Sequence, residues 1–107
     1  MKMEKYFLKQ GDLGNGFYLN RDLEINFELG GGRLYPVFSY HVKIRDIDFK
    51  GNSFNDSDAR KLLVEDIVKM YLNLEEVRKR EPLASWAESL RKELSDLLTP
   101  KNETEAK

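Results

Sequence analysis

The chain has 107 residues, no cysteine, and 18 basic against 19 acidic side chains. This length suits one domain with its own hydrophobic core, and the lack of cysteine excludes disulfides and thiolate chemistry. The balanced charge lacks the basic excess that is typical of phosphate-driven binding. No segment resembles a membrane span or a secretory signal, so the sequence predicts a cytoplasmic protein without a membrane partner.

Residues 17–29 alternate between apolar odd positions and polar even positions, which is typical of a half-buried strand. From Leu34 onward the apolar side chains stand at even positions instead. We predict antiparallel strands over residues 4–13, 17–29 and 33–45. The alternation leaves open whether residues 17–29 form one strand or a hairpin around residues 20–22.

Three consecutive glycines, at 30–32, separate the second and third predicted strands. A phosphate-binding loop would have to open a helix, whereas here a strand follows a strand. A two-residue turn at Gly31-Gly32 would place Leu29 opposite Leu34 and bring both apolar sets to one face. The glycines therefore predict a hairpin turn.

A second hairpin signal is the Asn-Gly pair at 15–16. A turn there would place Tyr6 opposite Ile25 and Leu8 opposite Leu23. After Ile44 the apolar residues move from even to odd positions, at Ile47 and Phe49. This change indicates either a bulge near residues 45–46 or a short fourth strand.

The period becomes helical after residue 55, with Asn55 or Asp56 as the candidate cap. We predict helices over residues 56–80 and 82–98, with Pro82 in the first turn of the second helix. An Asn-x-x-Glu pattern from Asn73 leaves open a break in the first helix. Tyr71 and Trp86 lie on the apolar stripes, so we expect both in the core.

These patterns define an α+β fold, in which a three- or four-stranded antiparallel meander over residues 4–50 is followed by two C-terminal helices packed on one sheet face. A single domain over residues 1–98 is expected. Residues 99–107 offer little to bury and predict a disordered tail.

One face of this sheet would remain uncovered, with acidic side chains on one strand beside basic side chains on the next. In the predicted register His41 faces Asp22. Tyrosines with flanking charges are typical of surfaces that bind proteins. The candidate partner-binding residues are Tyr18, Asp22, Glu24, Glu28, Tyr35, Val37, His41, Lys43 and Arg45.

We find no cofactor loop, no cluster of metal ligands and no nucleophile with a base, and the single histidine excludes a histidine pair for a metal. The sequence therefore favours a small non-catalytic binding protein, such as an adaptor, inhibitor or regulatory subunit. It would act on a protein partner through the open sheet face or an exposed strand edge.

Two alternatives from other functional classes stay open. A nucleic-acid-binding βββα module would need a basic patch, either from Arg21, Lys43 and Arg45 or from the cluster Arg78, Lys79 and Arg80. A magnesium-dependent nuclease would use the carboxylate-x-lysine pair Asp48 and Lys50 with a second carboxylate. A homodimer formed through the second helix is compatible with each of these functions.

Overall fold

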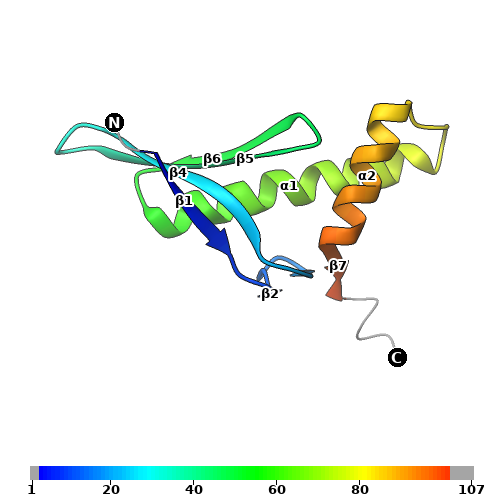
Figure 1. Cartoon of the computed structure of the whole chain (residues 1–107), viewed down its shortest axis with the longest axis horizontal. Coiled ribbons are helices and arrows are strands. Elements are labelled where there is room, and N and C mark those ends of the chain that lie inside the picture. The colour runs from blue at the N-terminus through cyan, green and yellow to red at the C-terminus, as the bar shows by residue number, and fades with distance from the viewer. Residues whose placement is uncertain (1–2, 102–107) are drawn as a thin grey trace.

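The computed structural model describes residues 3–101 and confirms the α+β architecture (Figure 1). Four strands form the main antiparallel sheet, in the order β1-β4-β5-β6: β1 (Met3–Leu8), β4 (Leu23–Gly31), β5 (Pro36–Ile44) and β6 (Ile47–Ser53). Two helices follow, α1 (Asp56–Arg78) and α2 (Ser85–Leu97). A small second sheet has the order β2-β3-β7: β2 (Gly11–Asp12), β3 (Phe17–Leu19) and β7 (Leu98–Pro100).

The pairing of β1 with β4 follows the predicted register, with Tyr6 opposite Ile25 and Leu8 opposite Leu23. The register between β4 and β5 differs from the prediction, because Leu29 lies opposite Phe38 and not opposite Leu34. The strands are joined by residues 32–35, a longer loop than the predicted two-residue turn. The partner of Leu29 shifts by four residues, an even number, so the apolar side chains keep to the predicted face.

The apolar phase slip reflects a fourth strand and not a bulge. A two-residue turn at Arg45 and Asp46 joins β5 to β6, and both residues have positive φ, 50° and 68°. Two consecutive positive φ values are those of a type I′ turn, whose twist matches that of a hairpin. Beyond the turn, Val42 lies opposite Phe49.

The strands predicted over residues 4–13 and 17–29 are each divided between the two sheets. The backbone N–H of Gln10 donates to the side chain of Asp22 where both chain segments leave the main sheet. The tip of the small hairpin closes when the N–H of Leu13 donates to the carbonyl of Phe17, so the loop has three residues instead of the predicted Asn-Gly turn. Residues 17–29 are thus neither one strand nor a hairpin around 20–22.

The disordered tail predicted over residues 99–107 includes residues that are ordered in the structure. Residues 98–100 form β7, which pairs with β3, and the N–H of Lys101 donates to the carbonyl of Gly16. Leu98 is only 2% exposed, so burial of its side chain accompanies the pairing. Residues 102–107 of the predicted tail lie outside the described part of the chain.

The helices differ from their predicted bounds mainly at their ends. Asn55 caps α1 by accepting from the N–H of Asp58, and the helix continues through Asn73 without a break. Residues 79–84 connect the two helices, so α2 begins at Ser85 and Pro82 precedes it. Neither helix in residues 3–101 is long and apolar enough to cross a membrane.

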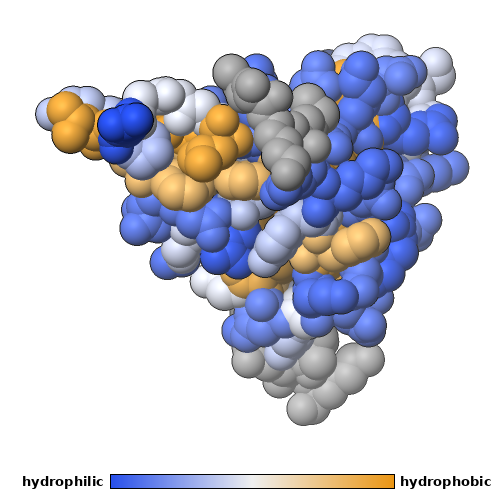
Figure 2. Space-filling view, turned by 60° about the vertical axis from the view of Figure 1, so that its left-hand side comes forward, coloured by the Kyte–Doolittle hydropathy of each residue, from blue (hydrophilic) through white to orange (hydrophobic). Residues whose placement is uncertain are grey.

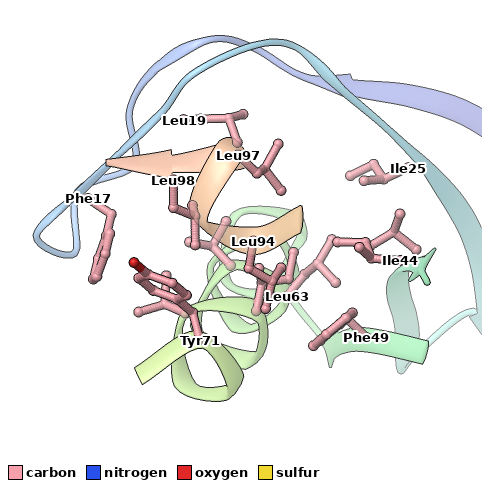
Figure 3. Close-up of a cluster of buried hydrophobic side chains, with 14 of the residues drawn as sticks. Phe17, Leu19, Ile25, Ile44, Phe49, Leu63, Tyr71, Leu94, Leu97 and Leu98 are labelled. Carbon is pink, nitrogen blue, oxygen red and sulfur yellow. The ribbon is translucent and has the colours of Figure 1, made fainter. Parts of the chain in front are cut away.

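The core lies between the sheets and the helices (Figure 3). Helix α1 packs across β5 and β6, and its backbone approaches Gly51 so closely that a Cβ there would collide with it. Helix α2 then covers the region where the small sheet meets α1. The largest side chains that are almost wholly buried are Ile25, Phe49, Leu63, Leu90, Leu94 and Leu97.

Candidate functional site

The face of the main sheet that points away from α1 carries a polar depression of about 370 Å³. Every second side chain of each strand points to this face. The register aligns Asn26, His41 and Lys50 across three neighbouring strands. Two predicted partner-binding residues, Glu28 and His41, line the depression. The complete lining is Glu28, Ser39, His41, Asp48, Lys50 and Asn52.

The observed register changes the neighbours of His41. We expected Asp22 across the hairpin, but His41 lies opposite Asn26 on one side and Lys50 on the other. The cause is the longer loop between β4 and β5, which moves every pairing along the strand. The predicted His41–Asp22 pair is therefore wrong.

The nuclease alternative depends on a second carboxylate close to Asp48. Asp48 lies opposite Lys43, whereas Glu28 lies opposite Ser39, which in turn faces Asn52. Four residues of strand separate the two carboxylate rows, or about 13 Å along the strand direction. Within the described residues no group of three or more histidine, aspartate or glutamate side chains is placed to hold a metal ion.

The end of the β4–β5 hairpin carries four exposed hydrophobic side chains, which we call the hairpin-end cluster: Leu29, Leu34, Tyr35 and Phe54. Their exposed fractions are 46%, 85%, 71% and 68%. The rings of Tyr35 and Phe54 pack against each other, with centroids 6.3 Å apart. In Figure 2 this end of the molecule presents hydrophobic atoms at the upper left.

The cluster is exposed because the hairpin extends beyond its supporting elements (Figure 1). Strand β6 ends at Ser53, opposite Phe38, and α1 begins only at Asp56. No element among residues 3–101 covers the last turn of the hairpin. Gly31, with φ of 76°, lies so close to the carbonyl of Tyr35 and to Val37 that a side chain would not fit there, which defines the shape of the loop.

Three other predicted binding residues have local structural partners instead. Tyr18 belongs to the small sheet, opposite Asp12 and Thr99, and does not lie on the open face. The carboxylate of Asp22 accepts from Gln10, and this bond is the main cause of its lowered pKa. Glu24 forms a 2.8 Å ion pair with Lys5 of β1.

The two edges of the main sheet differ in accessibility. The outer N–H of Lys50 in β6 donates to the Asp66 carboxylate of α1, at 3.2 Å, so the helix covers part of that edge. Strand β1 forms the opposite edge and has β4 as its only strand neighbour among the described elements. A strand added by a partner would therefore meet less obstruction at β1.

A basic patch forms at the end of the sheet farthest from the hairpin-end cluster. Arg21, which precedes β4, lines one depression of about 240 Å³ with Lys43 and Arg45 from the end of β5 and its turn. Arg21 is held there by Glu93 of α2, at 3.2 Å. One of the two basic sets that the nucleic-acid alternative needs therefore lines a single depression, together with the carboxylate of Glu93.

The second predicted basic cluster, Arg78 to Arg80, follows the end of α1. Arg78 pairs with Glu75 at 3.8 Å, and Lys79 pairs with Glu76 at 3.9 Å. These contacts between successive helix turns account for Arg78 and Lys79 without a ligand.

Trp86 is the functional candidate that the sequence pattern missed. We expected it in the core, but it is 61% exposed, whereas Tyr71 is buried as predicted. Because α2 begins at Ser85, Trp86 stands in its first turn, beside the β5–β6 turn instead of over the sheet. Helical spacing puts Trp86 on the same side of α2 as Leu90, so periodicity could not show that its ring is exposed in the first turn.

A partly buried polar network links the sheet to the start of α1. The hydroxyl of Tyr40 donates to Asp56, and Arg60 contacts both Asp56 and the hydroxyl of Tyr6. Burial, and then the bond to Asp56, raises the pKa of Tyr40 above its usual range. The network fixes α1 to the sheet, and we assign it a structural role.

Comparison of the chain with protein-family models, with curated proteins and with solved structures gives no match in any of the three. We therefore infer the function from the surfaces of the molecule.

Proposed function

We propose that this chain is a small non-catalytic protein that binds a protein partner through the hairpin-end cluster and the adjoining open face of the main sheet. The observation that carries the proposal is the exposure of Leu34, Tyr35 and Phe54 together at one end of the molecule. Large hydrophobic side chains that gather on a surface mark an interaction site, whereas single ones need no explanation.

The surroundings of the cluster support this assignment. A protein interface combines an apolar, often aromatic centre with a polar rim. The hairpin-end cluster offers such a centre, and the polar depression that contains Glu28 and Ser39 continues along the same two strands. Arg33 at the turn and Asp58 in the first turn of α1 are both exposed and add charges of both signs.

The aromatic rings of Tyr35 and Phe54 at the centre of the cluster also favour strong binding. Aromatic side chains contribute large contact areas with few rotatable bonds, and they are common among the residues that dominate binding. Tyr35 and Phe54 already pack together in the free chain, so their rings lose less freedom when a partner covers them.

Capture of the tagged protein from nuclease-treated native lysate, with quantitative mass spectrometry, tests the proposal. We expect a stoichiometric protein partner whose recovery falls at least about tenfold for the double variant Leu34→Ser and Tyr35→Ser. The matched control is Leu72→Ser, which changes another exposed leucine, 52% accessible, on α1.

Thermal unfolding of the same variants distinguishes binding from folding. Because Leu34 and Tyr35 are largely exposed, we expect the double variant to unfold near the wild-type temperature. Equal recovery of the partner by all three proteins would contradict the proposal. A large fall in the unfolding temperature of the double variant would show instead that the cluster supports the fold.

A further inference from the structure

The β5–β6 turn and α2 form a groove at the opposite end of the sheet from the hairpin-end cluster. A depression of about 360 Å³ lies between Arg45 and Asp46 of the turn and Ser85, Trp86 and Ser89 of the helix. It shares Arg45 with the basic depression that Arg21 and Lys43 line. The two depressions adjoin at Arg45, and together they contain three cations, the carboxylates of Asp46 and Glu93, and the exposed indole of Trp86.

The cations of this groove are available to a ligand. Lys43 and Arg45 are exposed, and neither side chain forms an ion pair or hydrogen bond within residues 3–101. Among residues 3–101, Arg21 is paired only with Glu93, in a contact that is open to solvent and therefore weak. An incoming phosphate can compete for Arg21 without breaking a buried contact.

The backbone at Arg45 gives a second and independent indication. Type I′ turns favour Asn-Gly, because both central residues have positive φ, yet this turn carries Arg45 and Asp46. A long side chain at positive φ costs stability, and such strained residues concentrate at functional sites. The strained position is the one that directs the shared arginine into the groove.

We propose that this groove binds single-stranded nucleic acid, with a base stacked on Trp86 and neighbouring phosphates on Arg45, Lys43 and Arg21. Single-strand binding sites combine an aromatic platform with cations that follow the backbone, and base stacking tolerates any sequence. Three cations correspond to a short contact of a few nucleotides. Asp46 and Glu93 limit the positive field, so the affinity is modest and depends on the stacked base.

The hairpin-end cluster contributes no residue to the groove, so this inference does not depend on the proposed protein partner. The cluster and the groove lie at the two ends of β5, which runs from Pro36 to Ile44, about 26 Å apart at the strand rise.

Tryptophan fluorescence tests the groove directly, because Trp86 is the only tryptophan. We expect titration with a ten-nucleotide oligothymidylate at low salt to quench the emission and to saturate. The logarithm of the affinity should fall with the logarithm of the salt concentration with a slope of about −2, from three phosphate contacts to a single strand. Absence of quenching at low salt would overturn the proposal.

Variants and competing probes complete the test. Arg45→Asn removes the charge and suits a positive φ, so we expect the fold to remain and the affinity to fall at least about fivefold. Lys61→Ala, at an exposed position near the start of α1, should bind like the wild type. If Arg45→Asn binds like the wild type, or if inorganic pyrophosphate quenches as strongly at equal concentration, the groove does not recognise a nucleic-acid strand.

Discussion

At the scale of single residues, Gly51 determines how closely α1 approaches the sheet. A Cβ at this position would overlap the backbone of Ala59 and Leu63, and backbone cannot rotate away as a flexible side chain can. The helix would have to move outward and loosen the contacts of Phe49 and Leu63. Gly51 therefore has a steric role, although nothing in the strand pattern around it distinguishes this glycine.

We expect Gly51→Ala to lower the free energy of unfolding by about 3 kcal/mol, as overpacking in a closed core does. Gly32→Ala is the matched control, since no atom lies within 4 Å of the Cβ position there and its φ is not positive. Chemical denaturation of both variants gives the comparison. Similar stability of the two would mean that α1 moves away without loss.

Tyr40 makes the free energy of unfolding fall at alkaline pH. Its folded pKa is raised, mainly by burial, so the neutral phenol stabilises the fold fully below the ordinary pKa of 10.0. That contribution is lost as the pH rises above this value, because the unfolded chain then releases the proton more readily.

We expect Tyr40→Phe to be less stable by about 1 kcal/mol at neutral pH, through loss of the bond to Asp56. Its urea midpoint should fall less than that of the wild type between about pH 8 and about pH 11. Tyr35→Phe, at an exposed ring, serves as the control with the wild-type pH profile. An equal fall for all three proteins would show that another group governs alkaline unfolding.

At the scale of elements, β7 joins the end of α2 to the small sheet. It is only three residues long, yet it pairs with β3 and contains Leu98, which is buried against both helices and the sheet. Thr99 adds a side-chain hydrogen bond to Asn20, at 2.8 Å. The segment after α2 thus closes the fold.

Leu98→Ala should cost about 3 kcal/mol, within the range for a buried leucine. Leu72→Ala provides the same chemical change at an exposed helix position and should change stability by less than about 0.5 kcal/mol. Urea denaturation measures both values. A small effect of Leu98→Ala would mean that β7 contributes little to the folded state.

The strand pattern predicted the elements better than it predicted their connections. Alternation and turn residues were sufficient for the β1–β4 register, including the pair Tyr6 and Ile25. They could not predict the four-residue loop between β4 and β5, because shifts by an even number of residues leave every face unchanged. They also missed β7, since pairing with β3 depends on tertiary contacts and Thr99-Pro100 resembles a helix stop.

At the scale of the whole molecule, the main sheet presents different chemistry at its two ends. The hairpin-end cluster is apolar and aromatic, whereas the groove at the β5–β6 turn carries Arg45 and Trp86. The β4–β5 hairpin extends beyond the start of α1, whereas α1 continues past the β5–β6 turn toward α2 (Figure 1).

The sequence predicted part of the candidate surfaces. Tyr35, Glu28 and His41 were identified from the alternation of the open face, and two of them line the polar depression. Leu34 and Leu29 were expected to be covered, and their exposure depends on how far the hairpin extends beyond α1. Such lengths are set by tertiary packing, which periodicity within one strand does not describe.

Site-specific photo-crosslinking in native lysate tests the central claim most directly. A benzophenone amino acid at position 35 would sit in the hairpin-end cluster, and the same group at position 72 would sit on the exposed side of α1. We predict one discrete protein adduct from position 35, resistant to nuclease and absent from position 72. No adduct at position 35, or the same adducts from both positions, would contradict a binding function at the end of the hairpin.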